Sequence, residues 1–396
     1  MLNFLYLYLF FTFLRSIYFY AVGFLFVPPE SSKKLKKLPL VTILIPGWNE
    51  EVGIVKTVNS CLSQTYSNLE IIVINDGSTD ATSKKVRQLM EKTQDPRIKL
   101  IDKENGGKWT ALNQGVLQAN GDWIVTIDAD SYLYPDAVEL CVNGLQDTKY
   151  MAGFGTIKIG NQDNLLEKMQ VFEYDVGFHL RKYQSVMNCV SVLPGAFAIF
   201  RKDFFEIVGM YDGNTCVEDM ELCIRSRYHK NVLMRYIPDA ICVTECPATW
   251  SGLLRQRFRW KKGLLGVLQM HWRLFFNSPT GQYKLFSFFE YPMIVLSLLE
   301  LITYPIFFLV LIFSISTSPD LMHSRFVVFY AFYIITIVII LWNDLFNSKQ
   351  YWKYMLFAPI LFSIIFTVEF FAFSKAIYAH FSKQAYTWTV WQRKGI

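Results

Sequence analysis

The chain has 396 residues, of which 52% are hydrophobic and 17% aromatic, and it carries a net charge of +6. Ordinary soluble domains are ~45–50% apolar, and the excess here falls in residues 2–27 and 285–379, which excludes a purely soluble protein. The clustered positive charges lie beside these apolar ends without any nucleic-acid-binding signature, so the composition favours a membrane surface and no nucleic acid as partner.

The first expected element is a membrane anchor within residues 1–30. Residues 2–27 form an apolar run long enough to cross a hydrocarbon core of about 30 Å. The run lacks the basic start and the small-residue cleavage site of a signal peptide. Four lysines follow within residues 33–37, and this charge places the following domain in the cytosol. Seven scattered cysteines argue against a disulfide framework and fit a reducing compartment.

The middle of the chain, residues 31–276, alternates strand and helix patterns. We expect strands at 41–46, 69–74, 98–101 and 123–127, and helices at 50–64, 80–91 and 110–119. Such alternation predicts an α/β domain with a Rossmann-like, mostly parallel, doubly wound sheet. Ligands bind such a sheet at the carboxyl ends of its strands, where Glu50, Asp76, Asp128 and Asp130 fall.

Three residues near these strand ends suit a nucleotide. Asp76 can accept hydrogen bonds from a ribose or a base, although Ser78 or Asp80 beside it could simply cap the next helix. Trp48 can stack on a base or pack under its own loop. Lys108, after two glycines, can meet a phosphate or remain a solvated lysine in a turn. The residues alone leave all three choices open.

Asp128-Ala129-Asp130 follows the fourth expected strand. Two carboxylates flanking a small residue suit a hard cation that takes oxygen ligands. The sequence therefore predicts a Mg²⁺ or Mn²⁺ site here, where the cation would offset charge on a diphosphate leaving group.

Glu218-Asp219 opens another expected helix, within Val217-Glu218-Asp219. Carboxylates in a first helical turn are often no more than a solvated acidic helix start. Transfer to a hydroxyl group, in contrast, needs a base that removes a proton. The residues alone do not decide between the two.

Gln256, Arg259 and Trp260 form the pattern QxxRW and share one helix face. Arg259 can bind a diphosphate through two parallel hydrogen bonds, and Trp260 can stack under a sugar. The alternative is a basic amphipathic helix lying on the membrane.

In this fixed order, from Pro46-Gly47-Trp48-Asn49-Glu50 to QxxRW, the motifs resemble the membrane-bound family 2 glycosyltransferases. This family includes cellulose, chitin, hyaluronan and poly-β-1,6-N-acetylglucosamine synthases, and the bacterial poly-N-acetylglucosamine synthases look nearest. The resemblance covers about the middle two-thirds of the chain. It implies a GT-A-type domain, a UDP-sugar donor, a growing polysaccharide acceptor and a Mg²⁺ or Mn²⁺ cofactor.

The resemblance also implies roles for single residues. Asp219 would be the catalytic base, Asp130 the metal ligand, and Asp128 a second ligand that faces the nucleotide. The substrate-binding residues would be Pro46, Trp48, Glu50, Asp76, Lys108, Asp128, Glu218, Gln256, Arg259 and Trp260.

Residues 277–396 are expected to form a membrane domain, with candidate spans at 285–315, 326–342 and 355–379. Lysines near 349–353 and positive residues in 383–394 both argue for the cytosolic side, so the number of crossings stays open. The expected protein is a multi-pass protein of the cell membrane with the bilayer and a small accessory membrane subunit as partners.

Two other functions compete with a processive synthase. A non-processive enzyme that glycosylates a lipid carrier would share the nucleotide site, but relatives that add one sugar usually lack QxxRW. A membrane scaffold with a decayed transferase domain should have lost carboxylates that this chain retains. A hyaluronan- or chitin-type product is a further alternative, because no residue here reveals sugar selectivity.

Overall fold

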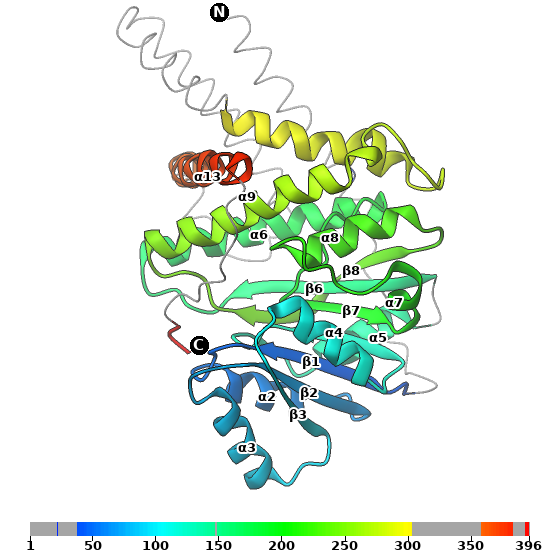
Figure 1. Ribbon diagram of the computed structural model, residues 1–396, viewed down its shortest axis with the longest axis vertical. Coiled ribbons are helices and arrows are strands. Elements are labelled where there is room, and N and C mark those ends of the chain that lie inside the picture. Colours follow the sequence, from blue (N-terminus) through cyan, green and yellow to red (C-terminus); the bar gives the residue numbers. More distant parts are fainter. Residues whose placement is uncertain (1–21, 23–37, 147–148, 303–357, 383–392, 396) are drawn as a thin grey trace, which may run out of the picture.

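The structure is a computed structural model that describes residues 22, 38–146, 149–302, 358–382 and 393–395. The expected span at 326–342 and nearly all of the N-terminal anchor lie outside the described residues. Figure 1 shows a sheet domain in the lower half and helices stacked above it.

The described strands form one sheet in the order β3-β2-β1-β4-β7-β6-β8-β5. Their bounds are Val41–Gly47 (β1), Leu69–Asp76 (β2), Ile98–Lys103 (β3), Trp123–Ile127 (β4), Tyr132–Leu133 (β5), Tyr150–Ile159 (β6), Phe197–Arg201 (β7) and Leu233–Thr244 (β8). The first four strands are parallel, as the sequence predicts.

The second half of the sheet is mixed, which corrects the expectation of a mostly parallel sheet. β7 pairs with both β4 and β6 in antiparallel fashion, and β5 pairs antiparallel with β8, while β6 and β8 are parallel. β7 begins opposite the carboxyl end of β4, where Phe197 pairs with Ile127. This reversal brings the loop that precedes β7 to the edge where the acidic motifs lie.

The helices of the sheet domain are Ile54–Leu62 (α2), Thr82–Thr93 (α3), Lys108–Gln118 (α4), Ala137–Leu145 (α5), Asp203–Val208 (α7) and Glu218–Arg225 (α8). α2 begins four residues later than expected. Residues 51–53 form a turn instead, and the Glu50 amide before this turn donates to the hydroxyl of Thr82, the first residue of α3, at 2.9 Å.

The core lies on both faces of the parallel strands. Every residue of β1 and β2 is buried, as in sheets that helices cover on both sides. α4 packs so closely that a Cβ on Gly115 would come 2.9 Å from Leu44 and 3.0 Å from Ile74. A larger side chain at Gly115 would therefore push α4 away from the sheet.

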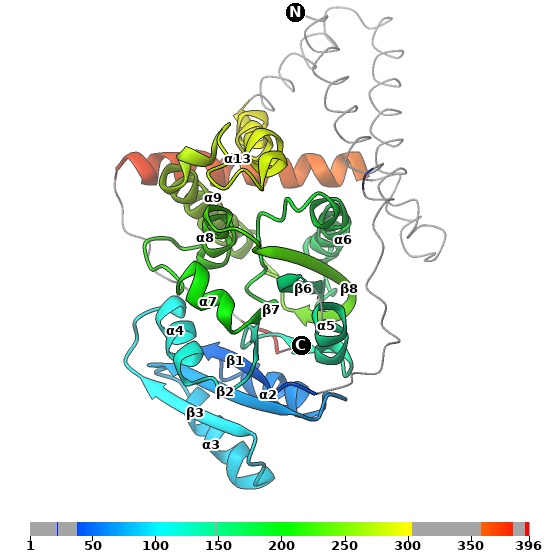
Figure 2. The same cartoon turned by 90° about the vertical axis from the view of Figure 1, so that its right-hand side faces the viewer.

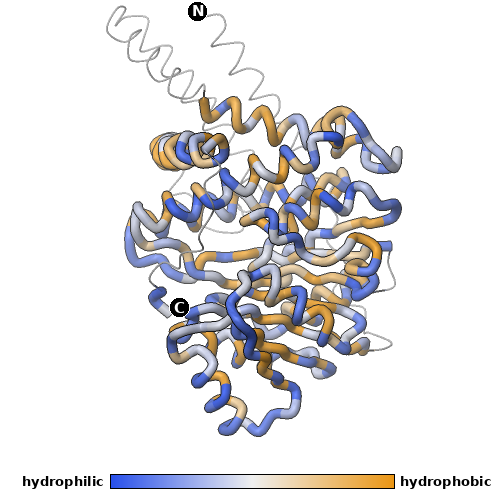
Figure 3. The backbone as a smooth tube through the Cα atoms, in the orientation of Figure 1, coloured by the Kyte–Doolittle hydropathy of each residue, from blue (hydrophilic) through white to orange (hydrophobic). Residues whose placement is uncertain are grey.

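A layer of helices covers one side of the mixed half of the sheet. Leu165–Val186 (α6) packs on β6 and β8, while Trp250–Met270 (α9), helical residues 284–302 and Ala358–Phe381 (α13) lie farther from the sheet (Figure 1). Figure 2 shows α13 lying across α9, and Figure 3 shows that α13 is largely hydrophobic.

A buried charge cluster joins three helices of this layer. Arg257 of α9 donates to Glu173 of α6 at 2.7 Å and to Glu369 of α13 at 3.1 Å, and Lys261 lies 2.8 Å from Glu369. Among the described helices, one, over Ser363–Phe381, is long and apolar enough to cross a membrane. This segment begins inside the expected span at 355–379 and ends two residues past it.

Candidate active site

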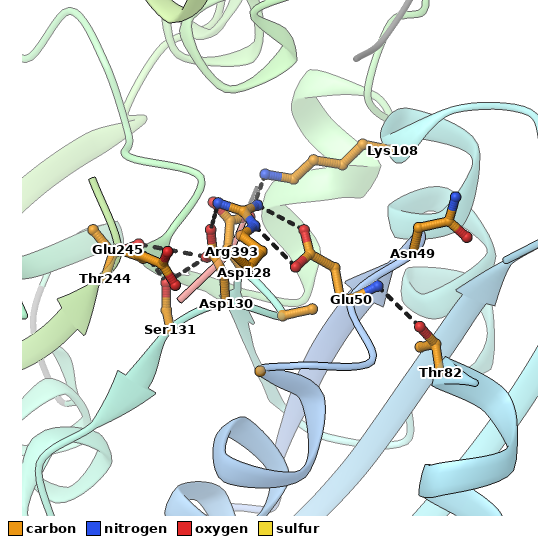
Figure 4. A network of polar contacts seen from close by, with 12 residues as sticks. Asn49, Glu50, Thr82, Lys108, Asp128, Asp130, Ser131, Thr244, Glu245 and Arg393 are labelled. Carbon is orange, nitrogen blue, oxygen red and sulfur yellow. Dashed lines mark hydrogen bonds and ion pairs between the residues drawn. The ribbon is translucent and has the colours of Figure 1, made fainter. Parts of the chain in front are cut away.

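The turn that follows β1 is tied to the turn that follows β2. The Asn49 amide donates to the Ser78 hydroxyl at 2.9 Å, and the Thr79 amide donates to the Asn49 side chain at 2.8 Å. Asn49 has a φ of 55°, a left-handed conformation that Asn tolerates better than most residues. These bonds fix Glu50 so that its carboxylate faces the residues after β4 (Figure 4).

The DxD segment is held from two sides. The Thr57 hydroxyl of α2 donates to the Ala129 carbonyl at 2.8 Å. On the other side, the Ser131 hydroxyl donates to Thr244 at 2.8 Å, and the Thr244 hydroxyl reaches Asp130 at 3.4 Å. The segment therefore has little freedom, and Asp130 points toward Glu50 (Figure 4).

The donor set fits a magnesium-like cation that also binds substrate. No three His, Cys, Asp or Glu side chains of the described residues gather closely enough to hold a metal alone. Mg²⁺ usually binds through one or two carboxylates and completes its shell with water and phosphate oxygens, which Asp128 and Asp130 would permit. A guanidinium, that of Arg393, already lies 2.5 Å from Asp130, so the site accepts a cation.

The Glu50 carboxyl has a raised pKa. Burial raises the pKa of its carboxyl to about 7, with Asp130 and Asp128 adding to the rise and Arg393 opposing it. Burial is the main cause of the rise, and the negative charges of Asp130 and Asp128 strengthen it.

Lys108 is the cation on the other side of the site. It is the first residue of α4, and its ammonium pairs with Asp128 and lies 3.5 Å from Glu218. Burial opposes its charge, but Asp128 and Glu218 together hold the pKa of Lys108 above its usual range. Lys108 is therefore a partly buried residue paired with carboxylates and not a solvated lysine in a turn, while its binding of a phosphate stays a prediction.

Asp76 is buried and faces the loop that leads to α4. Its carboxylate accepts from the amides of Gly106 at 3.0 Å and Gly107 at 2.8 Å, and the Lys103 ammonium lies 2.5 Å away. A Cβ on Gly77 would lie 2.6 Å from the Asn105 nitrogen, so the two loops cross with no room for a side chain. The bonds to Lys103, Gly106 and Gly107 were not predicted from the sequence.

Asp219 lies in the first turn of α8 and contacts the loop before β7. The Gly195 amide donates to Asp219 Oδ2 at 3.0 Å. A Cβ on Gly195 would lie 3.0 Å from the Lys108 ammonium, so this glycine separates Asp219 from Lys108. Glu218 is buried, and burial raises its pKa while Lys108 lowers it. The acidic start of α8 therefore belongs to the site and is not a solvated helix end.

The QxxRW pattern lies on α9, as expected, and reaches the site through the segment before α8. Arg259 donates to the Cys216 carbonyl at 3.2 Å. Gln256 is buried, and its side-chain oxygen has no hydrogen-bond partner among the described residues. Trp260 is partly buried against the cluster that contains Val217, and the Arg257 guanidinium lies 4.4 Å from its ring. The sequence prediction did not include this contact with Arg257.

Two predicted residues lie at the first strand end. Pro46 is buried within β1, where it pairs in register with Ile74, and Trp48 is half-buried in the turn that follows. The site thus gathers Glu50, Asp128, Asp130, Lys108, Glu218 and Asp219, with Asp76 in the neighbouring loop and the QxxRW residues on the α9 side.

Sequence reasoning missed Arg393. It used this residue only as a positive charge that argues for a cytosolic tail. Its guanidinium lies 2.6 Å from Glu50 and 2.5 Å from Asp130. No local signal in the sequence could have revealed a pairing of residues 343 positions apart.

Comparison with known proteins finds one matching family and several similar chains. Residues 42–209 match the family described as glycosyl transferase family 2. The poly-beta-1,6-N-acetyl-D-glucosamine synthase of Staphylococcus aureus (strain COL) is 32% identical over 254 residues, which are 63% of this chain and 60% of that protein. The enzyme of that name from Staphylococcus epidermidis is 31% identical over 226 residues, or 56% of this chain and 54% of that protein.

A solved structure shares the fold over nearly the whole chain. It is the mannosyltransferase PcManGT from Pyrobaculum calidifontis, in complex with GDP-Man and Mn²⁺. The TM-score is 0.64 and the identity 18%, and the match covers 97% of this chain and 100% of that one. At this identity the likeness shows the fold alone, which is a GT-A-like mixed sheet.

Residues 42–209 thus match a glycosyl transferase family 2 domain, and the chain is similar to glycosyltransferases of that family. Within the family it is similar to the staphylococcal poly-beta-1,6-N-acetyl-D-glucosamine synthases, and the predicted resemblance is confirmed. The chain spans about three-fifths of the length of these curated relatives.

Proposed function

We propose that the protein is a processive, inverting glycosyltransferase that polymerises UDP-N-acetylglucosamine into a β-linked polysaccharide and passes it through the membrane. The observation that supports this most is the meeting of the Asp128–Asp130 pair, Lys108 and Asp219 at one sheet edge, beside the QxxRW helix. The relatives named as synthases support the choice of sugar.

The donor half of the site would bind the nucleotide sugar. Asp130 and Asp128 would hold Mg²⁺ or Mn²⁺, which supplies positive charge to the departing diphosphate. Lys108 is held protonated beside Asp128 and can turn to a phosphate oxygen. Asp76 and Trp48 would face the uridine, and Arg259 would bind the diphosphate from the α9 side.

The acceptor half would centre on Asp219. Its carboxylate is held by the Gly195 amide and would take the proton of the acceptor hydroxyl as that oxygen attacks the sugar. A single displacement inverts the configuration, so an α-linked donor gives a β-linkage without a covalent enzyme intermediate. Gln256 has an unpartnered buried oxygen among the described residues, and with Trp260 it would line the path of the acceptor.

The membrane half of the proposal rests on composition and on α13. An N-terminal anchor and a C-terminal membrane domain would hold the catalytic domain at the cytosolic face of the cell membrane. The bilayer and a small accessory membrane subunit would be partners. α8, which begins with Glu218 and Asp219, packs beside α9, and α13 lies beyond α9 (Figure 2), which suits export of a growing chain.

Membranes that contain the protein would be incubated with labelled UDP-N-acetylglucosamine and Mg²⁺ or Mn²⁺, and the product would be sized on a gel. A long polymer is expected from this donor in preference to UDP-glucose, UDP-glucuronate or a mixture of the two. A product of one added sugar on a lipid carrier would favour the non-processive alternative, and a polymer made from another donor would correct the sugar.

A further inference from the structure

The last described residues of the chain lie inside the acidic site. Arg393 makes two hydrogen bonds to Glu50, at 2.6 and 3.1 Å, and its remaining terminal nitrogen lies 2.5 Å from Asp130. The Arg393 side chain is only 12% exposed. Figure 4 shows the guanidinium between the two carboxylates, where a cation is expected.

The backbone of the next two residues is also bound. The Lys394 amide donates to Glu245 Oε1 at 2.5 Å, and the Gly395 amide donates to Glu245 Oε2 at 3.1 Å. Gly395 has a φ of 77°, and a Cβ there would lie 2.7 Å from Val52. A single carboxylate thus accepts from two successive amides, and the position after the lysine requires glycine.

The Lys394 side chain, 37% exposed, pairs with two acidic residues. Its ammonium lies 2.6 Å from Glu167 and 2.9 Å from Asp163. Glu167 is fully buried and also accepts from the Asn161 side chain at 2.7 Å. Arginine, lysine and glycine therefore each meet a separate feature of the surface, which a chance contact of a charged tail would not produce.

We propose that Glu50, Asp130, Glu245 and Glu167 form a binding site for a basic Arg-Lys-Gly segment. Residues 393–395 of the same chain fill this site and compete with the divalent cation for Asp130. The competition rests on the proposed function, whereas the peptide site stands on its own contacts.

Competition follows from the geometry. A Mg²⁺ ligand oxygen lies at about 2.0–2.1 Å from the metal, so an ion on the Asp130 oxygen would overlap a guanidinium nitrogen at 2.5 Å. Either cation relieves the repulsion between Glu50 and Asp130. Without a divalent cation, Arg393 therefore stays bound to Glu50 and Asp130. A bound cation favours the state in which Arg393 has left these carboxylates.

Digestion with trypsin tests whether residues 393–395 are bound in the proposed site when no cation is present. Trypsin cuts after Arg393 and Lys394, so a bound segment should be protected. The purified full chain in detergent and chelator would be digested, and the release of the terminal Lys-Gly-Ile and Gly-Ile peptides followed by mass spectrometry. Release should be slow in the wild type and about tenfold faster in Glu245→Gln, as for a site occupied in about nine molecules of ten. Glu91→Gln, an exposed glutamate on α3, is the matched control and should resemble the wild type. Equal release from wild type and Glu245→Gln would overturn the peptide site.

Binding of Mn²⁺ tests the competition. Free Mn²⁺ would be measured by electron paramagnetic resonance while the ion is titrated into protein with saturating UDP. Arg393→Gln should bind Mn²⁺ about tenfold more tightly than the wild type, since the competing segment has lost its guanidinium. Lys56→Gln is the control. Lys56 and Arg393 line one pocket beside Asp130, so either substitution removes one positive charge there. The Lys56 ammonium, however, lies over the ring of Tyr132. Its Mn²⁺ affinity should stay within about threefold of the wild type.

The remaining outcomes separate the two proposals. If Arg393→Gln bound Mn²⁺ no more tightly than the wild type, or no more tightly than Lys56→Gln, competition would be wrong. Weaker binding of UDP by Arg393→Gln would also overturn it, because Arg393 would then be a donor-binding residue. Absence of Mn²⁺ binding by every form would remove the cation from the proposed function, and the trypsin result alone would decide the peptide site.

Discussion

Glu50 and Glu70 are buried carboxylates at opposite edges of the same parallel strands. They differ in their hydrogen-bond donors and in the direction in which their pKa is shifted. Glu70 is the second residue of β2, at the amino edge. It accepts from the Thr42 hydroxyl at 2.6 Å, from the Asn120 amide at 2.9 Å and from the Lys99 ammonium at 2.5 Å. Burial opposes its charge, but these hydrogen bonds outweigh burial and lower the pKa of Glu70 to about 2.

Glu50, at the carboxyl edge, has the opposite balance. Burial raises its pKa to about 7, and the neighbouring Asp130 increases the rise. The contacts of its carboxylate come from Arg393, in a distant segment of the chain. At the amino edge, donors from neighbouring strands and a loop thus offset the charge of Glu70. At the carboxyl edge, several carboxylates lie together, as in a site that binds a ligand.

The largest effect that would test this difference is removal of the cation. Chelator should abolish glycosyl transfer, and added Mg²⁺ or Mn²⁺ should restore it, because a cation on Asp128 and Asp130 would offset the charge of the departing diphosphate. Asp130→Asn should remain inactive after the cation is returned. Incorporation of labelled sugar is the measurement, and full activity in excess chelator would remove the metal role of Asp130.

Asp219→Asn should have the next largest effect. The amide keeps the size of the side chain but cannot accept a proton, so the rate should fall by ~10²–10⁴. UDP affinity, measured by calorimetry, should stay within a few-fold, because the nucleotide would bind nearer Asp128. Asp203→Asn, on the far surface at the start of α7, is the control. Wild-type turnover would move the base elsewhere, and loss of UDP binding would make the role of Asp219 structural.

The parallel strands and the acidic residues at their ends were predictable from the local sequence pattern. The first four strands and the carboxylates at their ends follow from apolar runs that stop at acidic residues, so Asp128 and Asp130 fell where expected. The predicted start of α2 was four residues too early, at the turn where the Glu50 amide donates to the Thr82 hydroxyl of α3. No strand was predicted after residue 127, so the antiparallel β7 was missed altogether.

The side-chain pairs of the site could not be predicted from the sequence, because their members lie far apart along the chain. Which carboxylate meets which cation depends on how distant segments pack, and sequence spacing is silent about this. Lys108 was therefore left between two roles until its contact with Asp128 was known, and Arg393 was read only for its charge.

A smaller effect is expected at the amino edge. Glu70→Gln replaces an acceptor by an amide that cannot satisfy the Thr42, Asn120 and Lys99 donors. A hydrogen bond to a charged group contributes about 1.5–3 kcal/mol, which predicts a fall in Tm of about 4–8 °C for the full chain in detergent. Glu91→Gln, exposed on α3, should leave Tm unchanged.

The pH dependence gives this prediction a second test. The folded-state pKa of Glu70 is lowered, so its contribution to stability is present above the unfolded pKa of about 4.3 and is lost as the pH falls toward about 2. The Tm values of wild type and Glu70→Gln should therefore converge in acid. A gap that stayed constant between pH 6 and pH 3 would show that packing, not charge, accounts for the loss.

The smallest effect is expected for Glu50→Gln, measured by the same thermal unfolding in chelator. A carboxyl group with a pKa near 7 is only partly ionised at neutral pH, so a neutral amide of the same shape removes little net charge stabilisation. The variant loses the ion pair with Arg393 but also relieves repulsion from Asp130, and the two changes oppose each other. Tm should shift by no more than about 2 °C, as for residues kept for function at some cost to stability. A fall as large as that of Glu70→Gln would mean that Glu50 is a structural anchor and that the two edges do not differ.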